Sequence, residues 1–494
     1  MKNLFSLLKE IEYKLYGNKA LLFSPVTSIC YSSREARKGA AFFCLKGEKN
    51  DGHIFAQEAY KKGTHIFFCE RFLSLPEDTI QIRVKNARAA LALISADFFE
   101  HPEKKLVIIG VTGTKGKSTV CEMISHILNS AGKKCSVIST LGIKIDGETT
   151  ETENSTPESY IIYKALKEAI TKNIKYAIVE VSSQALCRHR IDGLHFDAAV
   201  FTNLSRDHIG ESEHPDFTHY KEAKKSLFLR ADTAFINIDD DFGKEFSSFC
   251  SCPVYTYGAE NKADIRAKNF RSSLENGAFG VSFIYEHKAN KTQVKLPLPG
   301  QFSALNSLAS IAVCTHLGVP AEICAKALLH IQIDGRFEIA ACSRSDITCI
   351  IDYAHNKKSL ENAIFALREY NPKRIICIFG SVGGRTKERR HELGETAAAL
   401  ADICIITSDN PDFESPENII NEIASYIPNE KCVCITDRSK AIEYALEIAE
   451  SGDFLLFAGK GHEQYQLING KKLPFSEREL IKKHIFNKNF IPFP

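Results

Sequence analysis

Short apolar segments alternate with amphipathic stretches along most of the chain. In the first hundred residues, apolar runs at 40–45, 65–69 and 80–84 predict strands, and the stretches 55–62 and 87–99 predict helices. Further strands are predicted at 106–110, 135–139, 176–181, 198–202 and 233–238, and then at 347–352, 374–379, 403–408, 431–435 and 454–458. Each strand of the last group is expected to precede a helix. This alternation is typical of βαβ units and of mostly parallel sheets.

The chain has 494 residues, roughly three times the length of an ordinary domain of about 150 residues. The pattern changes near residue 100 and starts again near residue 335. We therefore predict three α/β domains, at 1–100, 101–334 and 335–494.

Composition narrows the class of protein. The 63 basic and 61 acidic residues leave a formal net charge of +2, so no excess of positive charge favours nucleic acid as a partner. No apolar run approaches the roughly 18 residues that a membrane span needs, and the first ten residues predict an amphipathic helix rather than a signal peptide. The 16 cysteines are scattered without metal-finger spacing, which favours buried thiols in a reducing cytoplasm.

A glycine-rich turn directly follows the strand at 106–110. It contains Gly113, Thr114, Lys115, Gly116, Lys117, Ser118 and Thr119 and leads into a helix predicted at 120–131. Glycines let the backbone turn around a phosphate, the helix N-terminus directs amide donors at it, and the Gly-Lys-Ser triplet supplies a cation and a hydroxyl for Mg²⁺. Val111 stands where a regular phosphate loop has glycine, so this is a shortened loop. The segment predicts binding of ATP or a close relative, and a plain surface turn is the weaker alternative.

Two further polar residues stand just beyond predicted strands. Glu180 and His208 would lie near the phosphate loop, because ligands meet at the carboxyl ends of strands in open α/β sheets. Each of them alone is as well explained by a solvated strand end or a helix cap. Together with the loop they favour a Mg²⁺ site. Lys224 lies in a charged helical stretch that would otherwise be interpreted as a solvated face.

Several of these segments together resemble the Mur ligases, the ATP-dependent amide-bond-forming enzymes of peptidoglycan synthesis. The resemblance rests first on residues 112–118, 201–208 and 220–228. It extends over nearly the whole chain through residues 33–34, 39–53, 302–306, 335–338 and 352–355. Residues 409–411 and 459–463 are similar to the amino-acid site of the branch that adds a diamino acid.

The resemblance implies a three-domain α/β architecture. A central domain with a phosphate-loop ATPase-like parallel sheet would bind ATP and Mg²⁺. An N-terminal domain would bind the UDP-sugar, and a Rossmann-like C-terminal domain would bind the amino acid. The resemblance also implies a cytoplasmic protein with small-molecule substrates, without nucleic-acid partners or membrane insertion, and we expect a monomer.

Residue roles follow from the same resemblance. Catalysis would depend on Lys117, Glu180, His208 and Lys224, with Lys224 carbamylated. ATP would contact Gly113, Thr114, Lys115, Gly116, Lys117, Ser118, Thr119, Asn306, Arg336 and Asp352, and the metal would be held by Ser118, Glu180, His208 and the carbamate on Lys224. The UDP-muramoyl dipeptide would contact Ser33, Arg34, Ser155, Thr156, Ser182, Arg188 and Arg190. The amino acid would contact Arg385, Asp409, Asn410, Asp412, Gly459 and Glu463.

Two residues depart from the family pattern. Lys115 replaces the usual asparagine, and the added positive charge is compatible with phosphate binding. Asp412 replaces an arginine that recognises meso-diaminopimelate in relatives, and an anion there would repel a distal carboxylate and favour a distal ammonium. We therefore expect L-lysine or L-ornithine as the acceptor. Diaminopimelate is the alternative, with Arg389 or Arg390 in the arginine's place.

Two other functions are alternatives. A folylpolyglutamate synthase-like ligase would share the fold, but the N-terminal segment and residues 459–463 do not favour it. A nucleotide-binding regulatory protein without ligase chemistry would keep the phosphate loop alone. The presence of Glu180, His208 and Lys224 argues against that function.

Overall fold

The computed structural model describes residues 2–47, 50–207, 209–210, 213–275, 278–340 and 346–488. Internal contacts divide the chain into two compact units. One comprises Met1–Asp264 and Ala312–Val319, and the other Ile265–Ile311 and Pro320–Pro494. The limits of the three domains predicted from the sequence stay a prediction.

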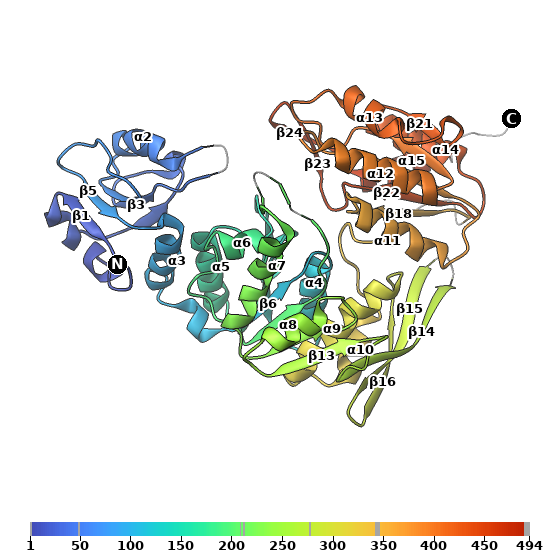
Figure 1. Ribbon diagram of the computed structural model, residues 1–494, viewed down its shortest axis with the longest axis horizontal. Helices are drawn as coiled ribbons and strands as arrows, with labels where there is room; N and C mark the ends of the chain where they lie inside the picture. Colours follow the sequence, from blue (N-terminus) through green and yellow to red (C-terminus); the bar gives the residue numbers. More distant parts are fainter. Residues whose placement is uncertain are drawn as a thin grey trace. The chain divides into compact units, whose positions relative to one another are not determined.

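The first unit begins with a five-stranded sheet, of which Figure 1 labels β1, β3 and β5. Its strands run in the order β1-β5-β4-β3-β2. Only the pairing of β1 with β5 is antiparallel. The strands and helices here are β1 Lys14–Gly17, β2 Ser28–Cys30, β3 Ala40–Phe43, β4 Ile66–Cys69, β5 Ile80–Arg83, α1 Leu4–Leu7, α2 Ala56–Lys61 and α3 Ala87–Phe98. Every residue of β3 and β4 is buried, as expected of central strands in a sheet covered on both faces.

A larger sheet with a parallel centre follows in the same unit. Its strands run in the order β13-β12-β11-β6-β10-β7-β8-β9, and the pairings are parallel except that β8 is antiparallel to both β7 and β9. The strands are β6 Val107–Thr112, β7 Cys135–Ser139, β8 Gly142–Ile145, β9 Glu148–Thr150, β10 Tyr176–Glu180, β11 Ala198–Phe201, β12 Ala234–Asn237 and β13 Val254–Gly258. The helices are α4 Lys117–Ser130, α5 Ser159–Thr171, α6 Ser183–Cys187, α7 Phe217–Lys225 and α8 Gly243–Phe249. Strand β6 lies between β10 and β11, so the segments that follow these three strands emerge at one edge of the sheet.

The second unit opens with an antiparallel group that the sequence pattern does not predict. It comprises β14 Ile265–Glu275, β15 Ala278–His287 and β16 Asn290–Leu296, and helices α9 Gln301–His316 and α10 Ala321–Leu328 follow. In β16 buried and exposed residues alternate, as in a strand with one face toward the core. The exposed face is polar, which hides the strand from a search for apolar runs.

The rest of this unit is a six-stranded sheet in the order β17-β18-β22-β19-β20-β21, parallel except for β17. Its strands are β17 Glu338–Ala340, β18 Thr348–Asp352, β19 Ile375–Phe379, β20 Ile403–Ile406, β21 Cys432–Cys434 and β22 Phe454–Ala458. The helices are α11 Lys357–Arg368, α12 Lys387–Leu400, α13 Pro416–Ala424, α14 Arg438–Ile448 and α15 Glu477–Lys488. One expectation was wrong: β22 leads into a hairpin, β23 Tyr465–Ile468 with β24 Lys471–Pro474, before the helix. This hairpin contributes to the second candidate site.

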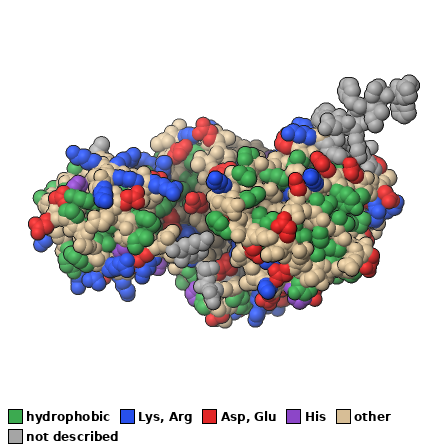
Figure 2. Space-filling view, turned by 90° about the horizontal axis from the view of Figure 1, so that it is seen from above, with side chains coloured by type: hydrophobic (Ala, Val, Ile, Leu, Met, Phe, Trp, Pro, Cys, Tyr) green, Lys and Arg blue, Asp and Glu red, His purple; other side chains and the backbone are tan. Residues whose placement is uncertain are grey.

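Two predictions from composition can be compared with the described residues. Every cysteine that they include is a free thiol, and most are buried. None of their helices has the length and apolar character that crossing a membrane requires. Basic and acidic side chains are interspersed on the face that Figure 2 shows, in keeping with the nearly balanced charge.

Candidate functional site

The phosphate loop joins β6 to α4. Gly113 has a φ of +149°, and a Cβ built on it would lie 2.0 Å from the Thr202 hydroxyl oxygen, so no other residue fits there. Gly116 has a φ of +83° and precedes the first helical turn, which contains Lys117, Ser118 and Thr119. A helix N-terminus presents unpaired amide N–H groups, so the turn is built to receive an anion.

Asn203, which follows β11, holds the loop in this shape. Its side-chain oxygen accepts a hydrogen bond from the Lys115 amide at 2.9 Å, and its side-chain nitrogen donates to the Lys115 carbonyl at 3.0 Å. Its carbonyl accepts from the Thr114 amide at 2.8 Å. The Lys115 ammonium lies 3.1 Å from the Asp207 carboxylate, so the unusual positive charge of this loop is paired.

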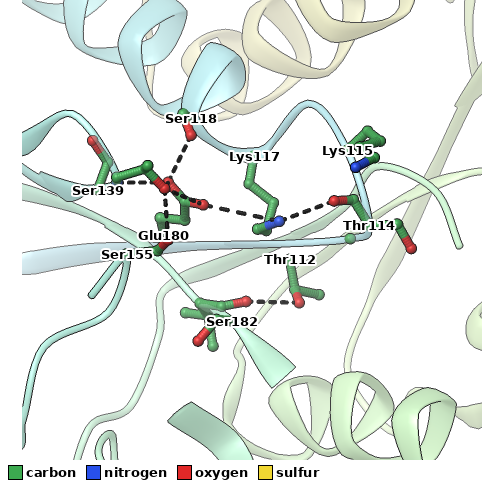
Figure 3. A network of polar contacts seen from close by, with 12 residues as sticks. Thr112, Thr114, Lys115, Lys117, Ser118, Ser139, Ser155, Glu180 and Ser182 are labelled. Atoms are coloured by element: carbon green, nitrogen blue, oxygen red, sulfur yellow. Dashed lines mark hydrogen bonds and ion pairs between the residues drawn. The ribbon is translucent and has the colours of Figure 1, made fainter. Parts of the chain in front are cut away.

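Glu180, at the end of β10, is the centre of a buried polar cluster (Figure 3). Its carboxylate accepts hydrogen bonds from the Ser118 hydroxyl at 2.8 Å and from the Thr140 amide and hydroxyl at 3.0 and 3.1 Å. The Lys117 ammonium lies 3.9 Å from the same carboxylate and donates to the Thr114 carbonyl at 3.1 Å. The structure thus brings together the loop cation, the loop hydroxyl and the strand-end carboxylate, as the sequence predicts.

This cluster fits a hard divalent cation. Mg²⁺ prefers oxygen ligands, and Ser118 and Glu180 place a hydroxyl and a carboxylate side by side at a phosphate loop. His208, the third predicted ligand, lies outside the described residues. Its role stays a prediction.

Lys224 reaches the loop from α7. Its side chain is buried, its ammonium donates to the Gly113 carbonyl at 2.7 Å, and it lies 4.6 Å above the centre of the Tyr220 ring. Burial, and next the positive charge of Lys117, hold the pKa of Lys224 well below its ordinary value. A buried lysine with a lowered pKa supplies the neutral amine that reacts with carbon dioxide.

Residues predicted to contact the dipeptide gather beside Glu180. The Thr156 hydroxyl donates to the Glu180 carbonyl at 2.6 Å and accepts from the Ser182 amide at 3.0 Å. The Ser155 hydroxyl accepts from Thr140 at 2.7 Å, and Arg190 donates to the Thr156 carbonyl at 3.0 Å. These contacts place four of the seven predicted residues at one edge of the sheet.

The other three residues predicted to contact the dipeptide are Ser33, Arg34 and Arg188. The Ser33 hydroxyl donates to Glu58 at 3.0 Å, and Arg34 is exposed in the same short helical turn of the N-terminal sheet. Arg188 is half-buried just beyond α6. Their roles stay predictions.

The remaining predicted ATP residues belong to the second unit. Asp352 is buried at the end of β18 and accepts from the Phe337 amide at 2.9 Å. The Arg336 guanidinium lies 4.7 Å from the centre of the Tyr353 ring, and its charge opposes the rise that burial causes in the pKa of Asp352. Asn306 is buried in α9. Contact of these residues with ATP stays a prediction.

A second buried polar cluster surrounds Lys460. Its ammonium donates to the Asn410 side-chain oxygen and to Glu463, each at 2.8 Å, and lies 3.7 Å from the Asp409 carboxylate. Asn410 also donates to Glu463 at 2.8 Å. Gly459 has a φ of +111°, and a Cβ there would lie 2.8 Å from an Asp409 carboxylate oxygen. The structure therefore brings together four of the six residues predicted to contact the amino acid.

Recognition of a distal ammonium requires that the Asp412 carboxylate be available to the acceptor, but this carboxylate is bound within the protein. Its backbone φ is +52°, its carboxylate accepts from the Gly470 amide at 2.7 Å, and its amide donates to the Leu467 carbonyl at 2.9 Å. These contacts make Asp412 a cap of the β23–β24 hairpin. They give its carboxylate a structural function that needs no substrate ammonium.

Three arginines of the second unit differ in the contacts that they make. Arg390 is buried and paired with Glu414 and Glu422 at 2.7 to 2.8 Å, and Arg389 donates to the His355 carbonyl at 2.8 Å. Arg385 is exposed. Arg389 and Arg390 are the two candidates for binding a distal carboxylate of the amino acid. The positive charge of Arg390 is already balanced by Glu414 and Glu422.

Sequence reasoning missed three residues that organise these clusters. Thr140 and Asn203 each stand just beyond a strand of the parallel sheet, and that position is the signal that could have found them. Lys460 lies within the predicted motif at 459–463 but was given no role. All three support the predicted residues by hydrogen bonds.

Comparison with known proteins agrees with this geometry. The chain matches the Mur ligase family catalytic domain over residues 25–99, the Mur ligase middle domain over 111–314 and the Mur ligase glutamate ligase domain over 335–461. It therefore belongs to the Mur ligase family and is an ATP-dependent amide-bond-forming ligase of peptidoglycan synthesis, with the three-domain α/β fold of that family.

Individual relatives cover nearly the whole chain. A protein of Caldanaerobacter subterraneus named UDP-N-acetylmuramoyl-L-alanyl-D-glutamate–2,6-diaminopimelate ligase is 38% identical over 97% of this chain and 98% of its own. A Clostridium botulinum protein of the same name is 35% identical over 98% and 99%. A solved structure with that name has a TM-score of 0.68 and 26% identity, covering 99% of this chain and all of its own. The MurF ligase of Thermotoga maritima in complex with ADP shares the fold, with a TM-score of 0.64 at 19% identity over 94% of this chain and 99% of its own.

Proposed function

We propose that this ligase joins meso-2,6-diaminopimelate to the D-glutamate of UDP-N-acetylmuramoyl-L-alanyl-D-glutamate, with conversion of ATP to ADP and phosphate. The observation that carries the proposal is the full-length similarity to two relatives named for this acceptor, at 38% and 35% identity. The relatives thus favour the alternative over lysine or ornithine. The contact of Asp412 with Gly470 removes the main support for an acceptor without a distal carboxylate.

The first step transfers a phosphoryl group. The γ-carboxylate of the D-glutamate attacks the γ-phosphorus of ATP, the bond to the bridging oxygen breaks, and ADP leaves the acyl phosphate. Both partners are anions, so the Lys117 ammonium beside the loop would lower their repulsion. When bound, Mg²⁺ would supply further positive charge, and Ser118 and Glu180 would hold it.

The second step forms the amide bond. The neutral amine of the amino acid attacks the acyl carbon, its surplus proton passes to solvent, and the bond from the acyl carbon to the phosphate oxygen breaks as phosphate departs from the tetrahedral intermediate. The second buried cluster would bind the amino acid, because Asp409 and Glu463 bring two carboxylates to one ammonium, Lys460. The charge left over is negative and suits the ammonium groups of a diamino acid. Arg385, which the resemblance assigns to the amino acid, would bind its α-carboxylate.

Lys224 would act in its carbamylated form. Its neutral amine adds to carbon dioxide, a proton is released, and the side chain ends in a carboxylate. Because the amine lies against the Gly113 carbonyl, the new anion would stand next to the phosphate loop, where it could help Glu180 hold Mg²⁺.

The acceptor is tested by phosphate release with ATP, Mg²⁺ and the UDP-muramoyl dipeptide. Diaminopimelate, lysine and ornithine are offered separately, and we expect diaminopimelate to give at least about tenfold higher kcat/KM, as the loss of a charged contact implies. Release that depends on lysine or ornithine instead would overturn the acceptor and keep the ligase. Absence of release with all three would contradict the proposed function itself.

Asp412→Ala separates the two roles considered for this residue. As a hairpin cap, Asp412 contributes about 1 kcal/mol to the free energy of unfolding, so the variant should be slightly less stable and keep the acceptor preference of the wild type. Thermal unfolding and the ratio of kcat/KM for diaminopimelate and lysine measure both effects. A large change in that ratio without loss of stability would indicate that Asp412 recognises the acceptor amino acid.

A further inference from the structure

Three potential metal ligands meet away from the Mg²⁺ residues. Cys187, His214 and His219 each offer one donor atom, and these atoms lie within 4.8 Å of one another. Cys187 is half-buried, His214 is buried and His219 is exposed, so the group reaches solvent on one side. None of the three is used by the ligase chemistry proposed above.

The local fold explains why they converge. Cys187 is the last residue of α6, and α6 packs against α7, which carries His219. Asp216 caps α7 and accepts from the His219 amide at 2.7 Å, which fixes the first turn beside His214. Residues about thirty positions apart are thus brought together by two helix ends. Spacing along the sequence does not reveal the group.

The two imidazoles face each other through their Nδ1 atoms. Their Nδ1 atoms lie 2.8 Å apart, and His214 Nε2 lies 2.9 Å from the Ser183 hydroxyl oxygen. If Nε2 of His214 donates to Ser183, its Nδ1 carries a lone pair toward His219. A hydrogen bond from the second ring nitrogen is how proteins fix the tautomer of a ligating histidine.

We propose that Cys187, His214 and His219 form a binding site for Zn²⁺ or a similar soft divalent ion. Tetrahedral Zn²⁺ binds sulfur and nitrogen at about 2.3 and 2.0 Å, which sets these three donors about 3.3 to 3.5 Å apart. The present donors lie within 4.8 Å of one another and the two Nδ1 atoms are 2.8 Å apart, so the side chains must shift for an ion to bind between them. One thiolate and two imidazoles select such an ion over Mg²⁺, and a water molecule would complete the coordination.

Binding has a defined proton balance and a structural consequence. The thiol of Cys187 loses its proton to solvent, and the proton on His219 Nδ1 moves to solvent while Nε2 takes one up, leaving both rings neutral. The ion then links α6, which follows Glu180, to α7, which carries Lys224. The site would fasten together two elements that position the catalytic cluster.

The test uses the full chain and the metal alone. Purified protein stripped of metal is titrated with Co²⁺, and a thiolate-to-cobalt charge-transfer band together with the intense visible bands of tetrahedral Co²⁺ is expected at one equivalent. Zn²⁺ should displace Co²⁺ and raise the melting temperature. Cys187→Ser should abolish the charge-transfer band and weaken Zn²⁺ binding by more than about 100-fold, and Ser183→Ala by about tenfold.

Controls distinguish this site from other thiols. Cys432 and Cys434 lie 4.0 Å apart and could bind metal themselves, so Cys432→Ser/Cys434→Ser should keep the cobalt spectrum. His219→Gln changes an exposed side chain, keeps the fold and should weaken Zn²⁺ binding at least about tenfold. A spectrum that survives in Cys187→Ser, or that is lost in the double variant, would overturn the proposal. So would the absence of Co²⁺ and Zn²⁺ binding by the wild type.

Discussion

Lys224→Ala is expected to lower kcat by about 10²- to 10³-fold, because it removes the side chain that we propose to carry a carboxylate next to the phosphate loop. Steady-state phosphate release measures the change. Short carboxylic acids such as acetate should restore part of the activity of this variant. Removal of carbon dioxide and bicarbonate from the buffer should lower the activity of the wild type alone.

Two matched variants exclude loss of structure as the cause. Lys221→Ala removes a lysine of the same helix that pairs with Glu245 at 2.9 Å, and its activity should stay within about twofold. Lys224→Met should be inactive and yet more stable at neutral pH, by about 0.5–2 kcal/mol. Full activity in Lys224→Ala would contradict the carbamate and the proposed mechanism together.

The expected gain in stability of Lys224→Met follows from the lowered pKa of Lys224. Burial and Lys117 lower the pKa of Lys224 in the folded chain, so the unfolded chain binds the extra proton between the two pKa values. The free energy of unfolding of the wild type, measured in carbonate-free buffer, should therefore rise with pH across that window. Lys224→Met should lack this component of the pH dependence.

Glu180→Gln is expected to lower kcat by about 10²- to 10³-fold and to raise the Mg²⁺ concentration needed for half-maximal activity. The amide keeps the shape of the side chain but removes the negative charge that Ser118 and Lys117 face. Phosphate release measured against Mg²⁺ concentration reports both effects.

Glu168→Gln provides the control for that change. Glu168 lies on α5 and forms an exposed pair with Lys172 at 3.4 Å, so its charge contributes little to stability. Its Mg²⁺ dependence should match that of the wild type. If Glu180→Gln behaved in the same way, Glu180 would be a structural residue and not a metal ligand.

The phosphate-loop site was predictable because its signals are local. A buried strand, a glycine turn and a helix occupy one short segment, and the structure places Lys117 and Ser118 beside Glu180 as expected. The same reasoning found most strands of the parallel sheets, whose burial on both faces gives continuous apolar runs. It missed β14, β15 and β16; in β16, exposed polar residues alternate with buried ones and interrupt such runs.

Contacts between distant segments could not be read from spacing. Asp412 was interpreted through its neighbours in sequence, whereas the group that decides its role is the Gly470 amide, about sixty residues later. Cys187 and His219 are separated by one strand, β11, and meet only after α6 packs on α7. Both outcomes depend on tertiary structure.

The crowding at Gly113 bears on the evolution of resistance. Any side chain at position 113 would collide with Thr202. The Gly113 carbonyl accepts a hydrogen bond from the buried Lys224. An inhibitor that rests on the main chain of residue 113 therefore faces a surface that substitution of that residue cannot reshape without disrupting the loop. Resistance to such a compound could arise by substitution of other contact residues. Substitution of Gly113 itself would inactivate the enzyme, because it would disrupt the phosphate loop.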